Sequence, residues 1–273
     1  MIHNLFKFVL KLINQRNRWI AEERKINIKI LSFIQSKKDV TLPEREKQFN
    51  KEIIIPCYNH GKYLKFILNI LEGVEIPITI IDDCSTDDSK RIILDLNKQY
   101  PFKFIENKHN LLQYGSLNKA VSQSENNFFI VINADDMLIP QWIEYAIQSF
   151  ENSNIFLFGG SCIPFQIPYE SNDKLCEIIK NTSYLPKNKM RIYNQEDAKR
   201  FNSFNSINMN MNGFCFLRSA WEYVGGFFPK EKRVCIHDDR DFQMRVCAFF
   251  DVGVSDEISA FVREDSSMER GTL

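Results

Sequence analysis

From residue 52 onward, short runs of apolar residues alternate with longer segments in which apolar residues recur every three or four positions. The short runs are typical of strands buried on both faces, and the longer segments are typical of helices with one apolar face. The predicted strands are 52–59, 78–83, 102–105, 128–133 and 155–160, and the predicted helices are 63–71, 86–97, 115–124 and 141–150. This alternation predicts an α/β fold, with a mostly parallel central sheet and helices on both faces.

The first 50 residues have a different pattern, which we interpret as a helical arm and a polar linker. Apolar residues between Leu5 and Ile13 recur at helical spacing, and a weaker stripe continues to Phe33, although KINIKI at 25–30 also alternates as a strand does. Residues 1–38 contain nine Lys or Arg and two Glu, a net charge of +7. A basic amphipathic helix can make peripheral contact with an anionic membrane, or it can pack on its own domain or on a second subunit. Both alternatives stay open at this point.

Composition limits the classes of function. The 273-residue chain has 35 Lys and Arg and 35 Asp and Glu, and this zero net charge argues against a nucleic-acid partner, which a basic surface would attract. Its seven cysteines form no C-x-x-C pair, which favours reduced thiols in a cytosolic protein. No apolar run approaches the roughly 20 residues of a membrane span, and no secretory signal is visible. We therefore expect a cytoplasmic protein, or one at the inner face of the cytoplasmic membrane.

Polar side chains follow three of the predicted strands directly. These strands end in Pro56-Cys57-Tyr58-Asn59, in Asp82-Asp83 and in Asn133-Ala134-Asp135-Asp136. Parallel strands bring such ends to one crevice, where ligands of α/β folds bind. Helix capping explains some of these residues, but paired carboxylates at buried strand ends repel each other, so we expect a divalent cation, Mn²⁺ or Mg²⁺. The chain has no glycine-rich phosphate loop, which disfavours a dinucleotide dehydrogenase or P-loop enzyme. A phosphate ligand at these acids would need that cation as a bridge, because carboxylate and phosphate repel each other.

A second acidic segment lies far downstream. Asp238, Asp239 and Asp241 stand in HDDRDFQMR, shortly after VGGF at 224–227. Acidic residues favour helix N-termini because of the helix dipole, so one interpretation is a charged helix start. Asp239 at such a start could also act as a general base, and the two interpretations are compatible.

Together these segments resemble the bacterial family 2 inverting glycosyltransferases of the GT-A fold, over about residues 52–250. The matching segments are IIIPCYNHGKYLKFILNIL, ITIIDDCSTDDS, residues 110–120, FFIVINADDMLIP, and VGGF with DDRDFQMRV. The resemblance implies a Rossmann-like GT-A domain at 51–273 behind the arm and linker at 1–50. Its nucleotide-sugar-binding half would be 51–160, and its acceptor-binding half would be 161–273.

The resemblance also implies roles for individual residues. The nucleotide sugar would be bound by Pro56, Tyr58, Asn59, Asp83, Asn118 and Asp135, with Asp83 on the edge of the base. Asp136, together with Asp135, would hold the Mn²⁺ or Mg²⁺ ion. Asp239 would be the catalytic base that deprotonates the acceptor hydroxyl. Other residues would lie on the acceptor side or beside the phosphates: Gly226, Asp238 and Arg263.

The implied function is transfer of a sugar, with inversion, from a nucleotide-diphosphate sugar such as a UDP-sugar to a hydroxyl of a glycan or lipid-linked acceptor. Cell-surface polysaccharide or lipooligosaccharide synthesis is the expected setting. Two residues depart from the family pattern, since Asn133 replaces the leading Asp of the metal motif and Asp238 replaces the usual Glu. Asn133, together with the absence from the tail FVREDSSMERG of the His that often follows the final strand in the family, motivates an alternative, a catalytically inactive nucleotide-sugar-binding or scaffold subunit. Residues 161–210 match nothing in the pattern, and the asparagines ending at Asn212 are interpreted as acceptor side or surface loop.

Overall fold

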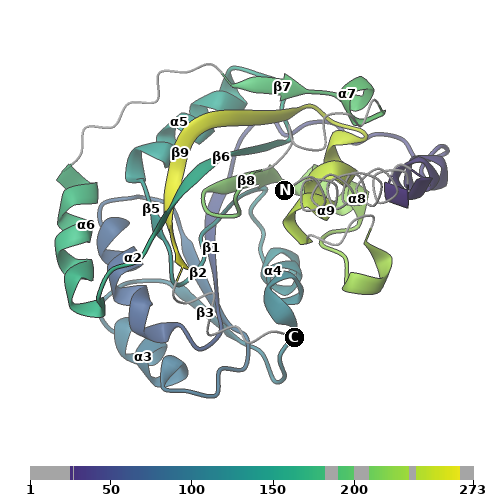
Figure 1. Ribbon diagram of the computed structural model, residues 1–273. Coiled ribbons are helices and arrows are strands. Elements are labelled where there is room, and N and C mark those ends of the chain that lie inside the picture. The colour runs from purple at the N-terminus through teal and green to yellow at the C-terminus, as the bar shows by residue number, and fades with distance from the viewer. Residues whose placement is uncertain (1–24, 27, 182–189, 200–208, 234–237, 265–273) are drawn as a thin grey trace, which may run out of the picture.

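The computed structural model describes residues 25–26, 28–181, 190–199, 209–233 and 238–264. Within these residues one curled sheet has the strand order β3-β2-β1-β4-β8-β6-β9-β5, and β7 pairs with β9 (Figure 1). The strands are β1 (Lys51–Cys57), β2 (Ile78–Asp82), β3 (Lys103–Glu106), β4 (Phe128–Val131), β5 (Met137–Leu138), β6 (Leu157–Phe165), β7 (Arg191–Tyr193), β8 (Phe214–Leu217) and β9 (Val252–Arg263).

The first four strands form the parallel part of the sheet, as the apolar runs predict. β1 lies between β2 and β4, and β3 follows β2 at the edge. Successive side chains of a strand point to opposite faces, so Ile54 and Val131 enter one core and Ile53 and Ile130 enter the other. The carboxyl ends of β1, β2 and β4 therefore lie along one edge, and each of the three is followed by its polar residues.

Helices cover both faces of the sheet, which confirms the predicted α/β architecture (Figure 1). The helices are α2 (Leu64–Ile70), α3 (Ser89–Leu96), α4 (Leu112–Ser122), α5 (Pro140–Glu151), α6 (Asn172–Asn181), α7 (Gln195–Lys199), α8 (Arg218–Val224) and α9 (Asp238–Cys247). Residues of α4, α8 and α9 pack into one core, whereas residues of α2, α3 and α5 pack into the other. α6 lies outside α2 and contributes Cys176 and Ile179 to a third apolar cluster.

The second half of the sheet contains antiparallel pairs that the apolar pattern does not predict. β8 runs antiparallel to both β4 and β6, while β6 and β9 are a long parallel pair. The two-residue strand β5 pairs with β9, with Met137 opposite Phe261 and Leu138 opposite Ala260. This pairing brings the end of β9, at Arg263, next to the residues that follow β4.

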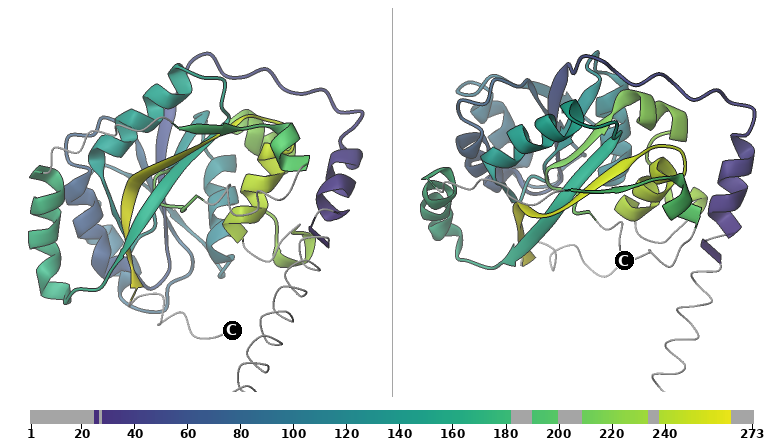
Figure 2. Two further views of the ribbon diagram at one scale, coloured as in Figure 1. Left: turned by 45° about the horizontal axis from the view of Figure 1, so that its top comes forward. Right: turned by 90° about the horizontal axis from the view of Figure 1, so that it is seen from above.

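The arm packs on its own domain wherever the structure describes it. Residues 28–36 are helical, so the strand alternative for KINIKI is not adopted there. Ile30 is completely buried, and the ring of Phe33 lies edge-on to Phe228 at 6.1 Å and to Phe249 at 5.8 Å. Both views in Figure 2 place this helix beside α8 and α9. The predicted helix at residues 5–13 lies outside the described residues.

The polar segment after the arm, which contains Arg45 and Glu46, is bound to the domain and is not a free linker. We call this segment the strap. The guanidinium of Arg45 donates to the carbonyl oxygens of Phe150 at 2.6 Å and Ile155 at 3.1 Å. The carboxylate of Glu46 accepts the backbone N–H and the hydroxyl of Ser219 at the start of α8. Within the described part of the chain, no helix is both long enough and apolar enough to cross a bilayer.

Candidate active site

The loops after β1 and β2 are tied to each other by side-chain hydrogen bonds. The backbone N–H of Asn59 donates to the Ser85 hydroxyl at 2.9 Å, and Asn59 Oδ1 accepts the N–H of Thr86 at 2.8 Å. Asn59 and Cys84 have φ values of 57° and 63°, a left-handed conformation that is uncommon for residues other than glycine. The loops therefore have a defined shape beside Pro56, which is buried, and Tyr58, which is 43% exposed at the rim.

The two carboxylates that end β2 have different partners. Asp82 accepts the backbone N–H of Ser85 at 3.1 Å and its hydroxyl at 2.5 Å, so it closes its own loop. Asp83 Oδ1 accepts the side-chain amide of Asn107 at 2.8 Å and the N–H of Leu111 at 2.7 Å. Structural capping therefore accounts for Asp82, whereas Asp83 is held in place by the loop after β3.

Asn107 is a site residue that the sequence analysis missed. It is buried beside the end of β3. Its Nδ2 atom also donates a hydrogen bond to the Ser116 hydroxyl, and its Oδ1 atom accepts one from the Lys119 ammonium group at 2.7 Å. Asn107 directly follows β3 in the structure, but the apolar pattern predicts a strand that ends at residue 105, so Glu106 separates the two in the sequence. A single polar residue near the end of a short strand is equally typical of a turn, so the sequence does not single out Asn107.

Asp135 and Asp136, which follow β4, are both 2% exposed and lie next to each other. Burial, and then the neighbouring charge of Asp135, raise the pKa of Asp136 to about 7. Hydrogen bonds oppose this shift, since Oδ1 accepts the N–H of Arg263 at 2.8 Å. The Oδ2 atom accepts the side-chain amides of Asn133 at 3.0 Å and Asn212 at 2.5 Å. The imidazole Nδ1 of His60 lies 3.6 Å from Asp135 Oδ2.

Asn212 is a second residue whose position the sequence analysis missed. It is fully buried in the turn before β8, although the Asn-rich stretch that contains it had the pattern of an exposed loop. Its Oδ1 atom accepts the backbone N–H of Asn133 at 2.7 Å. Only the antiparallel pairing of β8 with β4 brings these two loops together, and no pattern along the chain indicates that pairing.

Arg263 lies at the end of β9 and is almost completely buried. Its guanidinium lies over the rings of Tyr63 at 4.5 Å and Phe165 at 4.6 Å. It donates to Asn172 Oδ1 at the start of α6 and, at 3.3 Å, to the carbonyl oxygen of Asp135. These contacts connect α6 to the loop that carries the two carboxylates.

Asn118 and Gly226 are brought together, away from the strand ends. Asn118 Oδ1 accepts the indole N–H of Trp221 at 3.0 Å and the N–H of Phe227 at 2.9 Å, and its amide donates to the Phe227 carbonyl at 2.8 Å. Gly226 has a φ of +71° and approaches Asn118 so closely that a Cβ atom would lie 2.7 Å from this oxygen. In this arrangement the side chain of Asn118 holds the turn after α8.

Asp239 lies in the first turn of α9, and Asp238 is the first residue of that helix. Asp239 is half-buried, and its Oδ1 accepts the N–H of Arg240 at 2.8 Å. One turn further along, buried Gln243 exchanges two hydrogen bonds with the backbone of Met209. Residues four apart share a helix face, so Asp239 lies on the face of α9 directed to the segment that leads to Asn212.

The carboxylates after β4 suit a divalent cation that also binds a phosphate. No three His, Cys, Asp or Glu side chains gather into a complete metal site within the residues described. Mg²⁺ is commonly held by one or two carboxylates together with substrate phosphates, without a full cage of protein ligands. Asp135 and Asp136 are therefore a fitting donor set for Mg²⁺ or Mn²⁺, because their adjacent buried charges need compensation.

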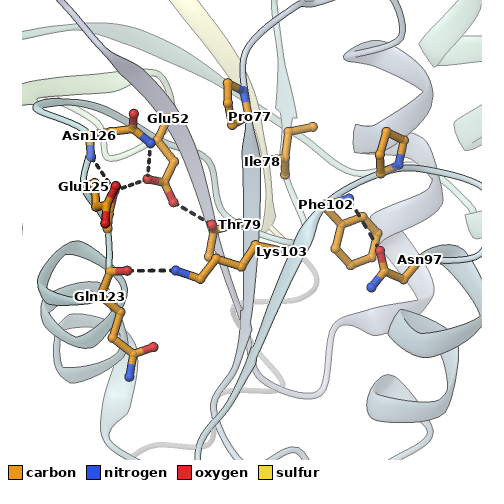
Figure 3. Close-up of a pocket in the computed structure, with 12 residues that line it drawn as sticks. Glu52, Pro77, Ile78, Thr79, Asn97, Phe102, Lys103, Gln123, Glu125 and Asn126 are labelled. Carbon is orange, nitrogen blue, oxygen red and sulfur yellow. Dashed lines mark hydrogen bonds between the residues drawn. The ribbon is translucent and has the colours of Figure 1, made fainter.

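A separate cavity of about 720 Å³ opens at the opposite edge of the sheet, where the parallel strands begin (Figure 3). Its buried carboxylate, Glu52, accepts the hydroxyl of Thr79 at 2.5 Å, the hydroxyl of Ser124 and the amide of Asn126 at 2.9 Å. The hydrogen bonds of the Glu52 carboxylate are therefore made with neighbouring side chains of the same chain. The cavity lies away from the acidic residues and is not the candidate active site.

Comparison with known proteins is consistent with this geometry. The family model described as "Glycosyl transferase family 2" matches residues 52–220, which contain β1 to β8 except for the first residue of β1. The chain belongs to glycosyl transferase family 2. The match covers the loops after β1, β2 and β4, together with Asn212, and it ends before Asp239 and Arg263.

Relatives within the family cover only part of the chain. Over 126 residues it is 25% identical to a poly-beta-1,6-N-acetyl-D-glucosamine synthase of Staphylococcus epidermidis, covering 40% of this chain and 31% of that protein. Over 100 residues it is 29% identical to the poly(ribitol-phosphate) beta-N-acetylglucosaminyltransferase TarS of Staphylococcus aureus, covering 34% of this chain and 18% of that protein. The chain thus spans less than a third of the length of both relatives.

Solved structures share the fold. TarS residues 1–349 in complex with UDP-GlcNAc superimpose with a TM-score of 0.57 at 16% identity, over 78% of this chain and 58% of that chain. The mannosyltransferase PcManGT from Pyrobaculum calidifontis, in complex with GDP-Man and Mn²⁺, has a TM-score of 0.56 at 13% identity, over 89% of this chain and 66% of that chain. These similarities confirm the predicted GT-A fold.

Proposed function

We propose that this protein is an inverting glycosyltransferase that moves a sugar from a UDP-sugar to a hydroxyl of a glycan or lipid-linked acceptor. The observation that carries the proposal is the gathering of Asp83, Asp135 and Asp136 at the carboxyl ends of β2 and β4, inside the segment that matches the family. UDP-GlcNAc is the first donor to test, because both staphylococcal relatives are named for N-acetylglucosamine chemistry. Cell-surface polysaccharide synthesis is the setting that these relatives suggest.

In the proposed reaction each acidic site has its own task. Asp83 accepts an N–H from the base, and Asp135 accepts a hydroxyl of the ribose. Asp239 accepts the proton of the acceptor hydroxyl as that oxygen bonds to the anomeric carbon and the bond from that carbon to UDP breaks. A cation held by Asp135 and Asp136 would neutralise charge on the departing UDP. Attack opposite to the leaving group inverts the anomeric configuration.

The test separates donor binding from transfer. UDP binding is measured by calorimetry, and transfer from UDP-GlcNAc is measured against a panel of glycan and lipid-linked acceptors. Asp239→Asn should bind UDP like the wild type and lose at least 100-fold in transfer rate, since general-base catalysis contributes a factor of this order. Asp256→Asn is a suitable control, because Asp256 is exposed and pairs with Arg191 on the surface. UDP binding without transfer by the wild type would favour the inactive subunit instead.

We also propose that the outer face of the arm contacts an anionic membrane, where a lipid-linked acceptor would be found. Ile28 and Leu31 are 67% and 56% exposed on the helix whose other face is buried against the domain, and residues 1–38 carry a net charge of +7. Ile28→Glu with Leu31→Glu should abolish co-sedimentation with phosphatidylglycerol vesicles, while Leu94→Glu, at a 45% exposed position on α3, should not. Binding that survives the double substitution would contradict the proposal, and dimerisation without vesicle binding would assign the face to self-association.

A further inference from the structure

The orientation of the Asn212 side chain is fixed by a backbone group. A backbone N–H can only donate, so the atom that faces the N–H of Asn133 at 2.7 Å must be the oxygen Oδ1. The amide nitrogen of Asn212 therefore faces Asp136, 2.5 Å from Oδ2. The side chain is completely buried, so bulk solvent does not reach these hydrogen bonds.

The orientation of Asn133 follows from its two neighbours. Its Nδ2 atom lies 3.0 Å from Asp136 Oδ2, which accepts hydrogen bonds, and its Oδ1 atom accepts the Nε2 group of Gln113 at 2.5 Å. Turning the amide of Asn133 over would place its oxygen against the carboxylate oxygen of Asp136. Asn133 therefore presents a donor to Asp136, and its own oxygen is already bound to Gln113.

The carboxylate of Asp136 has more acceptor positions than its hydrogen bonds use. A carboxylate has about four lone-pair positions, two on each oxygen. Oδ2 receives two amide donors, from Asn133 and Asn212, whereas Oδ1 receives one, the N–H of Arg263. Among the residues that the structure describes, no donor takes the remaining position, which is on Oδ1.

We infer that Asn133 and Asn212 are positioning residues that form an amide clamp on Asp136, and that Asn133 is not itself a ligand of the cation. The inference rests on the proposed function, and it explains how the Oδ1 atom of Asp136 is directed to the ion. Lysine or arginine donors at these positions would repel a divalent cation, whereas amides orient the carboxylate without adding charge. The Asn at the leading position of the metal motif is then part of a working site and not a sign of a lost one.

The clamp predicts equal roles for two residues far apart in the sequence. Asn133→Ala and Asn212→Ala should each weaken Mn²⁺ binding about tenfold in the presence of UDP, measured from the electron paramagnetic resonance signal of free Mn²⁺. Asn126→Ala is the matched control, because it also removes an amide donor from a buried carboxylate, Glu52, but at the other edge of the sheet. This control should change Mn²⁺ affinity less than twofold, and UDP affinity in EDTA should stay within twofold for all three variants.

Several results would overturn the clamp. Near-normal Mn²⁺ affinity in Asn212→Ala, with a large loss in Asn133→Ala, would make Asn133 a ligand. If Asn212→Ala does not fold, electron–nuclear double resonance of the wild-type Mn²⁺–UDP complex provides the test. A coupling of Mn²⁺ to ¹³C-amide asparagine would overturn the inference. A coupling to ¹³C-carboxyl aspartate alone would support it. UDP binding without any Mn²⁺ binding would overturn the clamp alone, whereas no UDP binding would overturn the proposed function and the clamp with it.

Discussion

Two glycines with the same backbone conformation differ in what a side chain would meet. Gly226 and Gly73 have φ values of +71° and +84°. A Cβ on Gly226 would lie 2.7 Å from Asn118 Oδ1, an atom fixed by two donors, whereas a Cβ on Gly73 would meet nothing within 4 Å. Only the tertiary contact with Asn118 distinguishes Gly226 from Gly73.

We predict that Gly226→Ala is clearly more destabilising than Gly73→Ala. Gly73→Ala should cost about 1 kcal/mol for the left-handed conformation, and Gly226→Ala should cost about 3 kcal/mol because of the added clash. Urea denaturation of both variants measures the difference. Equal free energies of unfolding would mean that the turn after α8 moves away from Asn118 at little cost.

Asp136 leads to a prediction about pH. Its pKa of about 7 lies above the ordinary value of 3.8, so ionisation is disfavoured in the folded protein. The contribution to stability is therefore complete below about pH 4 and is lost as the pH rises through about 7. In EDTA the wild type should lose up to about 4 kcal/mol more than Asp136→Asn between pH 4 and pH 8.

Thermal unfolding across this pH range checks the prediction. The exposed substitution Asp256→Asn should keep the wild-type pH dependence. Parallel curves for the wild type and Asp136→Asn would show that the carboxylate ionises without cost in the folded state.

At the scale of elements, α9 illustrates how one acidic motif divides into different tasks. Asp241 and Arg245 are four residues apart, are both almost fully buried, and form an ion pair at 2.7 Å. The guanidinium also lies 3.7 Å over the ring of Phe228 and donates to the carbonyl of Val224. These contacts hold α9 against the turn after α8, whereas Asp239 on the same helix stays half-exposed.

We predict that Asp241→Asn destabilises the protein by about 3–5 kcal/mol, because it removes the charged carboxylate that pairs with the buried guanidinium of Arg245. The control is Asp95→Asn on α3, which breaks exposed pairs with Arg91, at the same spacing of four residues, and with Lys98. This change should cost at most about 0.5 kcal/mol. Chemical denaturation compares the two, and a small effect at Asp241 would mean that water reaches Arg245.

Elements with a strong pattern were predictable, and elements formed by pairing were not. The strands β1 to β4 and the helices α2 to α5 match the periodicity of their residues. β5 has only two residues, and residues 25–30 fit both a helix and a strand, so neither contains enough pattern to decide. Pairing with β9 decides the first case, and packing on α8 and α9 decides the second.

At the scale of the whole molecule, the arm and strap belong to the folded body as far as the structure describes them. Neighbouring residues of the arm provide a matched pair, since Ile30 is fully buried and Leu31 is 56% exposed. Ile30→Ala should cost about 2–4 kcal/mol, and Leu31→Ala should cost less than about 0.5 kcal/mol. If thermal or urea unfolding showed that both substitutions change the free energy of unfolding by similarly small amounts, the arm would leave the domain in solution.

The sequence by itself determined the parallel α/β half of the sheet and the identity of the acidic residues at its carboxyl edge, because buried strands and strand ends are local patterns. It did not determine which polar groups support those acids. Asn212 reaches Asp136 through the pairing of β8 with β4, and Arg263 reaches it through the pairing of β9 with β5. Such contacts join residues 76 and 127 positions apart, and only the folded sheet brings them within hydrogen-bonding distance.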